Sequence, residues 1–440
     1  MRPSSLIGHA AEALDRILRS REPADVVVQD FFRARRYLGA RDRRVIGDTV
    51  FDVLRNHTYL TALWRHAVPA GARAAAPALA LLLVHAIMVR KEEEAAIREG
   101  FEALWRMLMR TPSLEQSAAA LREAREKFVL PASPVERLAL LHSLPRAVVA
   151  DWVARYGENE AEGLCRASNT PAPTTLRVNT LRCTVEECRI ALSAEGVDTS
   201  SARLSPVGLV LGKRVHLGAL RSFRQGWFEV QDEGSQLLSL LVDPRPGMTV
   251  VDACAGGGGK TLHLAALMRN QGRILALDVA EDRLRNLSRR AVRAGVTIAA
   301  PALAAPRLID SLAGAADAVL IDAPCSGTGT FRRNPGAKLR FTPDAVTGLR
   351  RTQGRLLADC QRMVRPGGLL VYATCSLLRA EGQEQIADFL AAHADFALLS
   401  AGALLHRHGV AAGDFPDTLE LLPHRTGTDG FFAAVMRRAG

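Results

Sequence analysis

Two short motifs place a cysteine and a serine directly after an apolar run. In "AVLIDAPCSGTG" the run ends at Asp322 and Cys325 follows three residues later, and in "LLVYATCS" Cys375 closes the run. A thiolate is a soft nucleophile that can add to C6 of a pyrimidine, and the addition makes C5 able to attack a methyl donor. A second thiol can assist the later release, and a carboxyl group such as Asp322 can stabilise the charge that builds on the ring. The pair therefore suits covalent chemistry on a pyrimidine base.

Other roles for these cysteines stay open when each is taken alone. A free cysteine is most often a small buried apolar residue. A disulfide between Cys325 and Cys375 is disfavoured in a reducing cytosol. No Cys-x-x-Cys pair or His/Cys cluster has zinc spacing, so we expect no metal. The remaining cysteines are expected to be structural: Cys165, Cys183, Cys188, Cys254 and Cys360.

A glycine-rich loop lies upstream, in "DACAGGGGKT" (252–261). A Walker A phosphate loop would need a glycine at position 254, where the chain has Cys254. The other interpretation is a nucleotide loop whose glycines let the backbone approach a ligand. Asp278, 26 residues after Asp252, closes the next apolar run and is placed to bind ribose hydroxyls. Because no second phosphate-reading element is present, S-adenosylmethionine is favoured over a dinucleotide.

The elements that position these residues alternate between strand-like runs and helical segments. The strand-like runs are 248–254, 273–278, 317–323 and 369–375, and the turn "RPGG" precedes the last of them. Such alternation predicts a parallel, doubly wound α/β sheet. Ligands bind at the carboxyl ends of the strands in such sheets, which is where Asp252, Asp278, Asp322 and the two cysteines fall.

The first half of the chain has a different pattern. Residues 1–144 are expected to be all-α, since apolar residues such as Leu6, Ala10 and Leu14 recur at helical spacing. Residues 145–228 are expected to form a small α+β domain, in which Thr184 and Glu187 form a capping box. Residues 229–440 would then be the catalytic α/β domain. The apolar stretch 74–89 is shorter than the roughly 18 residues that suggest a membrane span, so we expect a cytoplasmic protein.

The charge of the chain is strongly positive. The formal net charge is +11, and 57 residues are Lys or Arg, of which five are lysines. Arginine pairs with phosphates and stacks on bases, so RNA is a candidate partner, although solvated arginines on an ordinary surface fit the composition equally well. The candidate phosphate contacts are Arg36, Arg43 and Arg44 between the first helices, and Arg332, Arg333 and Lys338 after Cys325.

These motifs together resemble the RNA 5-methylcytosine methyltransferase family. "DAPCSGTGTFRRNP" and "YATCSL" look like its paired signature blocks, "DACAGGGGKT" is similar to its cofactor loop, and "HRTGTDGFFAAVMRR" resembles its closing block. Within the family, the bacterial 16S rRNA cytosine-C5 enzymes with a NusB-like N-terminal domain are the most similar group. The resemblance implies a Rossmann-like methyltransferase domain, a NusB-like helical domain and an RRM-like middle domain.

The resemblance also implies roles for particular residues. Cys375 would be the nucleophile, Cys325 would aid product release, and Asp322 and Lys260 would contact the cofactor side and the target base. S-adenosylmethionine would lie against the loop, and Asp278 would hold the ribose. The loop residues concerned are Cys254, Ala255, Gly256, Gly257, Gly258, Gly259 and Lys260.

Two departures from the family pattern are visible. The family's loop usually carries a proline where this chain has Gly257 or Gly258. Its members also place an acidic residue after the third strand, near the adenine, whereas this chain has alanines around Ala302. An RNA-binding protein with a decayed methyltransferase domain is therefore the alternative to a monomeric enzyme acting on ribosomal RNA, or on transfer RNA.

Overall fold

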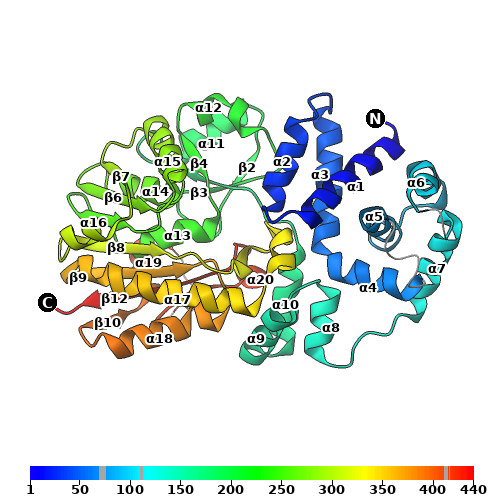
Figure 1. Ribbon diagram of the computed structural model, residues 1–440. Coiled ribbons are helices and arrows are strands. Elements are labelled where there is room, and N and C mark those ends of the chain that lie inside the picture. Colours follow the sequence, from blue (N-terminus) through cyan, green and yellow to red (C-terminus); the bar gives the residue numbers. More distant parts are fainter. Residues whose placement is uncertain (69–75, 110–111, 411–414, 416) are drawn as a thin grey trace. The chain divides into compact units, whose positions relative to one another are not determined.

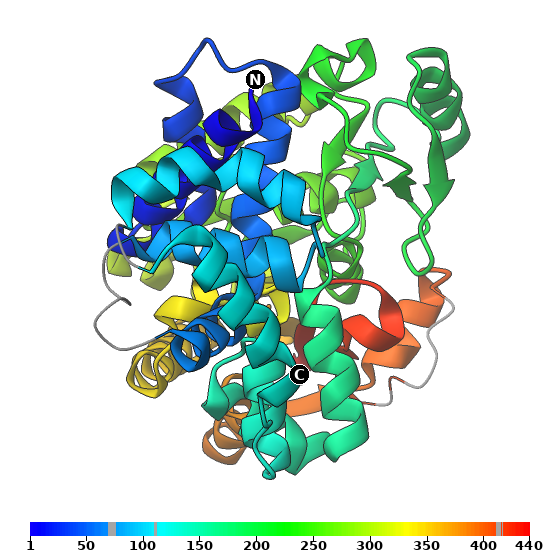
Figure 2. The same ribbon diagram turned by 90° about the vertical axis from the view of Figure 1, so that its right-hand side faces the viewer.

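The computed structural model describes residues 1–68, 76–109, 112–410, 415 and 417–440. It divides into two compact units, which Figures 1 and 2 draw in sequence colours. The first unit comprises residues 1–171 and the short segment 331–341. The second comprises residues 172–330 and 342–440. The expected boundaries at 144/145 and 228/229 remain a prediction.

The first unit is built from helices, and those within residues 1–128 share one apolar core. Its elements are α1 (Pro3–Arg19), α2 (Ala24–Arg33), α3 (Ala40–Arg55), α4 (His57–Ala67), α5 (Pro77–Met88), α6 (Glu94–Leu108), α7 (Leu114–Lys127), α8 (Pro134–Leu141), α9 (Arg146–Tyr156), α10 (Glu158–Asn169) and the 3-10 helix η4 (Pro335–Arg340). Helix α1 buries Ala10, Leu14 and Ile17, as the apolar spacing predicts.

The apolar stretch 74–89 is accounted for by α5. Residues 78–87 of this helix are all buried, and α5 packs against α1, α4 and α7. A helix that is apolar on every side is stable only where neighbours cover it. Residues 74 and 75 lie outside the described residues. No helix in the described part of the chain is long and apolar enough to cross a membrane.

The second unit begins with a small antiparallel sheet of strand order β2-β3-β1-β4. Its elements are β1 (Thr175–Val178), α11 (Val185–Ala194), β2 (Thr199–Ser201), β3 (Gly208–Leu211), η2 (Leu217–Ala219), α12 (Arg221–Arg224) and β4 (Phe228–Val230). The capping box of α11 is present as predicted: Thr184 Oγ1 accepts a hydrogen bond from the backbone N–H of Glu187 (3.2 Å), and Glu187 accepts one from Thr184 N (2.7 Å).

A larger sheet with the order β10-β12-β9-β8-β5-β6-β7 forms the rest of the unit, and β11 pairs with β12. Its strands are β5 (Thr249–Asp252), β6 (Arg273–Asp278), β7 (Ala299–Leu303), β8 (Ala316–Asp322), β9 (Val364–Thr374), β10 (Phe396–Leu399), β11 (Leu419–Leu421) and β12 (Phe431–Arg438). Strands β5–β9 are mutually parallel, and β12 is antiparallel to β9.

Helices cover both faces of this sheet (Figure 1). The remaining elements are α13 (Glu233–Leu241), α14 (Gly259–Leu267), α15 (Glu281–Ala294), α16 (Pro306–Ser311), η3 (Thr328–Thr330), α17 (Pro343–Cys360), η5 (Gln361–Met363), η6 (Arg379–Glu381), α18 (Gln383–Ala392), α19 (Ala401–Arg407) and α20 (Pro423–Thr426). Helices α13, α14, α15 and α19 share one core with the sheet, and α16, α17 and α18 share the other.

One local expectation was wrong. The "RPGG" segment does not form a turn before the last parallel strand but lies inside β9. Gly367 has a φ of 74° there, and the pairing of β8 with β9 shifts register between Ala316 and Ala318. An irregularity of this kind accommodates a proline and two glycines without ending the strand.

Candidate active site

The carboxyl ends of the central parallel strands bring the site together. β5 ends at Asp252, β6 at Asp278 and β8 at Asp322, while β9 ends one residue before Cys375. Asp252 pairs in register with Ala276 and Leu320, and Asp322 pairs with Ala373. Because neighbouring parallel strands lie about 4.8 Å apart, side chains that follow them can meet in one pocket.

A cavity of about 490 Å³ lies at this edge. The volume is in the range of small-molecule sites, which is roughly 300–1,000 Å³. Its lining is supplied mainly by the loop after β5, the end of β6 and the start of the loop after β8. The lining residues are Asp252, Ala253, Cys254, Ala255, Gly256, Gly257, Gly259, Lys260, Asp278, Val279, Arg283, Ala304, Asp322, Pro324, Thr352 and Leu356.

The glycine loop between β5 and α14 forms one wall of the cavity. Gly256 and Gly258 have φ values of 54° and 85°, which residues with a side chain rarely adopt. A Cβ on Gly258 would also lie 2.6 Å from Leu287. Asp278 fixes the start of the loop, because its Oδ2 accepts a hydrogen bond from Gly256 N at 2.9 Å. Its carboxylate lines the cavity and keeps lone pairs that can accept hydrogen bonds from a ligand.

A partly buried ion pair also lines the cavity. Lys260 Nζ is 2.5 Å from Asp322 Oδ2. Burial lowers the pKa of Lys260, but the attraction of Asp322 outweighs it, so the pKa lies above its usual value and the amine is charged. Asp252 is fully buried nearby and accepts a hydrogen bond from Thr261 Oγ1 at 2.7 Å. Burial raises the pKa of Asp252 to about 6, although the Thr261 bond lowers it.

The two cysteines of the paired motifs meet. Cys325 Sγ and Cys375 Sγ are 3.3 Å apart, and both residues are half-buried and free. The hydrogen bond to Cys375, together with burial, raises the pKa of Cys325 well above its usual value. Cys325 is therefore a neutral thiol that can donate a hydrogen bond to the sulfur of Cys375. Cys325 directly follows Pro324, which lines the cavity.

Comparisons with known proteins agree with this geometry. The profile of the family described as 16S rRNA methyltransferase RsmB/F matches residues 239–437, and that of its ferredoxin-like domain matches residues 144–217. The probable ribosomal RNA small subunit methyltransferase B of Bacillus subtilis is 36% identical over 325 residues, which are 72% of each chain. The chain belongs to the RsmB/F family of 16S rRNA methyltransferases.

Further relatives support the assignment. A ribosomal RNA small subunit methyltransferase B of Xylella fastidiosa is 40% identical over 294 residues, covering 66% of this chain and 65% of the relative. The crystal structure of PH0851 superposes with a TM-score of 0.79 at 27% identity, covering 100% of this chain and 99% of PH0851. A methyltransferase homologue from Pyrococcus horikoshii superposes with a TM-score of 0.60 at 29% identity, covering 70% of this chain and all of the homologue. As a member of the RsmB/F family, the chain is an RNA methyltransferase that uses S-adenosylmethionine.

The cavity suits this cofactor. One wall is a glycine loop whose backbone a ligand can approach closely, and the carboxylate of Asp278 lies beside it. The Oδ1 atom of Asp252 is buried without a hydrogen-bond partner among the described residues. A ligand that donates a hydrogen bond, such as the ammonium group of an amino acid, would satisfy such an acceptor.

Sequence reasoning missed the residues that hold the cysteine loop in place. Glu381 is fully buried, and its carboxylate accepts hydrogen bonds from Ser326 N (2.9 Å) and Gln353 Nε2 (3.0 Å). Gln353 also donates to the Pro324 carbonyl (2.9 Å), and Thr328 Oγ1 accepts from Leu377 N (2.9 Å). The signal available in the sequence was an acidic residue shortly after the "TCS" motif. If such a residue is buried, its carboxylate needs hydrogen-bond donors nearby.

At the end of the third parallel strand, an alanine rather than an acid lines the cavity. The residue that lines the cavity from this strand is Ala304, directly after β7, rather than Ala302. Ala304 N donates to the Asp278 carbonyl at 3.0 Å, which fixes its place. The cavity wall is completed there by Val279 and Arg283, which the sequence did not single out.

The expected position of the second basic group was wrong in two of its three members. Lys338 and Arg332 are buried, and Lys338 Nζ donates hydrogen bonds to the Arg55 carbonyl (3.4 Å), the His142 carbonyl (3.3 Å) and Asn169 Oδ1. The segment 331–341 belongs to the first unit, and both side chains are buried there rather than displayed to solvent. Arg333 alone is exposed.

The basic residues between the first helices, Arg36, Arg43 and Arg44, also differ in their exposure. Arg36 and Arg44 are exposed. Arg43 is half-buried, and its Nε donates to the Leu38 carbonyl at 2.8 Å, which gives it a structural role. Among the described residues, no group of three or more His, Cys, Asp or Glu side chains is arranged to hold a metal ion.

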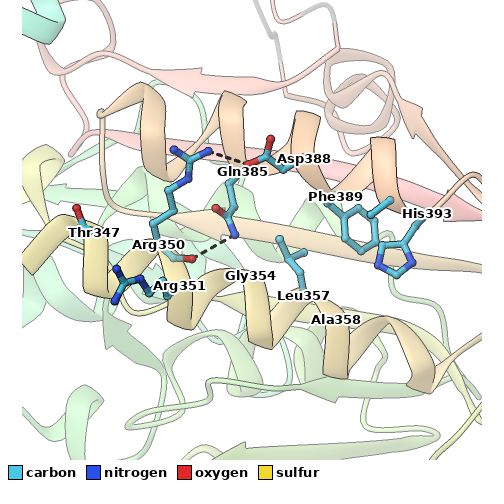
Figure 3. A pocket seen from close by; sticks show the side chains of 11 residues that line it. Thr347, Arg350, Arg351, Gly354, Leu357, Ala358, Gln385, Asp388, Phe389 and His393 are labelled. Carbon is cyan, nitrogen blue, oxygen red and sulfur yellow. Dashed lines mark hydrogen bonds and ion pairs between the residues drawn. The ribbon is translucent and has the colours of Figure 1, made fainter.

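A second cavity, of about 460 Å³, lies between α17 and α18 (Figure 3). Its floor includes Leu357 and Phe389. On its rim, Arg350 forms an ion pair with Asp388 at 2.7 Å, and Gln385 Nε2 donates to the Arg350 carbonyl at 3.4 Å. None of the residues that line it belongs to the glycine loop or the cysteine motifs, so it is not part of the candidate active site.

Proposed function

We propose that this chain methylates C5 of a cytosine in 16S rRNA through a transient covalent bond between Cys375 Sγ and C6 of the base. The observation that carries the proposal is the 3.3 Å approach of Cys325 Sγ to Cys375 Sγ beside the Asp322–Lys260 ion pair. Two thiols at this distance suit a reaction that must first form and later break a sulfur–carbon bond.

Each residue of the site has its own role in the proposed reaction. Cys375 as thiolate attacks C6, and as electron density shifts toward N3 the ammonium of Lys260, held by Asp322, donates a proton to N3. S-adenosylmethionine supplies the methyl group that C5 then accepts. Release requires that water take the proton from C5 and that the C5–H electron pair form the C5–C6 double bond, while the electron pair of the Sγ–C6 bond returns to Cys375. The proton on N3 returns to Lys260. The neutral thiol of Cys325 supports that last step, because its hydrogen bond stabilises the departing thiolate.

The target base must leave its stack to reach Cys375, as in other enzymes that act on bases. Exposed arginines of the first unit, Arg36 and Arg44, are proposed to hold RNA phosphates. The names of the relatives in Bacillus subtilis and Xylella fastidiosa support ribosomal RNA as the substrate. A cytoplasmic location and a monomeric state complete the proposal.

The test follows the methyl group and the adduct separately. Cys375→Ser should reduce methyl transfer from labelled S-adenosylmethionine to below about one thousandth of wild type, because the nucleophile is lost. The same variant should form no adduct with RNA that contains 5-azacytosine. Cys325→Ser should accumulate a protein–RNA adduct with ordinary RNA, because release is slowed.

Three outcomes would contradict the proposal. Full methylation by Cys375→Ser would exclude the covalent step. Absence of any adduct for Cys325→Ser under excess RNA would exclude the division of roles between the thiols. A wild-type protein that binds RNA without transferring a methyl group would support the alternative of an RNA-binding protein with an inactive methyltransferase domain.

A further inference from the structure

The carbonyl groups of the glycine loop are held from outside the loop by two arginines. Arg290 of α15 donates from Nη1 to the Gly257 carbonyl at 2.6 Å. Arg177 of β1 donates from Nη1 to the Gly259 carbonyl and to Gln231 Oε1. The two donors come from different elements, the sheet of the middle region and a helix of the catalytic region, and they meet on the same loop.

Glu229 on β4 ties these arginines together. Its carboxylate is 3% exposed and accepts hydrogen bonds from Arg290 Nη2 at 2.9 Å and from Arg293 Nη2. Glu229 also pairs in register with Arg177 across the β1–β4 ladder. Burial lowers the pKa of Arg177 to about 9, and Glu229 opposes this, so the guanidinium remains charged near neutral pH. A buried charge is costly unless it is paired, and here the guanidinium of Arg177 donates a hydrogen bond to a loop carbonyl.

The loop needs this external support because of its composition. The loop has four consecutive glycines, and each glycine loses more conformational freedom on folding than a residue of any other type. A peptide unit is planar, so fixing the carbonyl of one residue also fixes the N–H of the next. The two arginines therefore orient the N–H groups of Gly258 and Lys260, on the loop that walls the cavity.

We propose that Arg177 and Arg290 are positioning residues that pre-organise the glycine loop for S-adenosylmethionine. The proposal rests on the assignment of the loop cavity as the cofactor site. A pre-formed loop binds its ligand without the entropic cost of ordering it, so the two arginines act on cofactor affinity and not on the chemical step. It also makes the small sheet of the middle region a structural part of the cofactor site.

The chain offers a matched pair of variants for the test. Arg290 and Arg293 both lie on α15 and both pair with Glu229, but only Arg290 has a described contact with the glycine loop. Arg290→Met should raise the dissociation constant of S-adenosylmethionine about tenfold or more, since a charged hydrogen bond is lost. Arg293→Met should leave the constant within about twofold. Calorimetry with S-adenosylmethionine alone measures both, and melting temperatures show whether each variant is folded.

Steady-state kinetics add a second measurement. With a 16S rRNA transcript, Arg290→Met should raise KM for S-adenosylmethionine by the same factor and leave kcat at saturation nearly unchanged. Arg177→Met should behave likewise, because methionine cannot donate the two hydrogen bonds that Arg177 Nη1 makes to Gly259 and Gln231. Equal dissociation constants for the Arg290→Met and Arg293→Met proteins would overturn the proposal.

Asp278→Ala separates this inference from the assignment of the site. If Asp278→Ala weakens S-adenosylmethionine binding and Arg290→Met does not, the site is correct and the positioning role is wrong. If neither variant changes the dissociation constant, the cofactor does not bind at this loop, and both proposals are wrong.

Discussion

At the scale of single residues, Asp252 shows how a binding site can oppose stability. Its carboxyl group is fully buried, accepts a hydrogen bond from Thr261, and leaves Oδ1 without a described partner. Burial disfavours the charged form, so the native state binds a proton more tightly than the unfolded chain does. Functional sites commonly keep such unfavourable groups, because a ligand compensates them.

This gives a prediction for pH and stability. The pKa of Asp252 is raised from 3.8 to about 6, so the native protein holds more protons between these values and this group's contribution to stability falls as pH rises through that window. Asp252→Asn keeps the shape and the acceptor for Thr261 but cannot ionise. We expect its melting temperature to exceed that of wild type by a few degrees at pH 7.5, and the difference to shrink toward pH 4.

Thermal denaturation of both proteins across this pH range, without ligand, measures the effect. Asp252→Asn should also weaken S-adenosylmethionine binding, because an amide is a poorer acceptor for a charged donor than a carboxylate. A melting-temperature difference that stays constant from pH 4 to pH 7.5 would contradict the assigned ionisation.

At the scale of elements, the two cysteines are held together by contacts between the segments that follow β8 and β9. Ala323 N donates to the Ala373 carbonyl (2.8 Å), and Gly329 N donates to the Cys375 carbonyl (2.9 Å). Gly329 and Gly430 pack backbone against backbone, and Gly430 N donates to the Gly329 carbonyl at 2.8 Å. The closing block of the sequence thus acts through its backbone on the loop that carries Cys325.

Gly329→Ala tests this arrangement. A Cβ at this position would lie 2.2 Å from the Gly430 carbonyl oxygen, so the loop must move away from β12. Because a displacement of about 1 Å can cost a hundredfold in rate, methyl transfer should fall by about that factor. Gly348→Ala is the matched control: a Cβ there, on α17, meets nothing within 4 Å, so activity should be kept. Wild-type rates for Gly329→Ala would show that the contact is not needed.

At the scale of the whole molecule, the arginines have two separate uses. Some build the interior, as Arg177 and Arg332 do, and others are displayed to solvent, as Arg36 and Arg44 are. The segment 331–341 belongs to the first set although it directly follows the cysteine loop: burial and the nearby charge of Arg55 lower the pKa of Lys338 to about 7. Only the displayed arginines are available to RNA.

The double variant Arg36→Ala, Arg44→Ala should bind RNA more weakly. It should reduce the dependence of log K on log salt by about 1.5, since each phosphate contact contributes roughly 0.7–0.9. S-adenosylmethionine affinity should not change. The control is Arg122→Ala with Arg125→Ala, which removes two exposed arginines from α7 and alters the net charge equally. Equal losses of RNA affinity for the two pairs, measured by filter binding at several salt concentrations, would show that total charge and not position matters.

The sequence alone determined much of this protein. The alternation of apolar runs and helices predicted the parallel sheet, because period and turn residues are local properties. Motifs at strand ends placed Asp252, Asp278, Asp322 and the two cysteines at one edge, because parallel strands end on the same side. The tertiary structure decided which side chains are interior and which contacts cross between elements. That Lys338 is buried, that Glu381 holds Ser326 and that Arg177 reaches Gly259 depend on residues 55 to 283 positions apart in the chain, and no local pattern encodes such pairings.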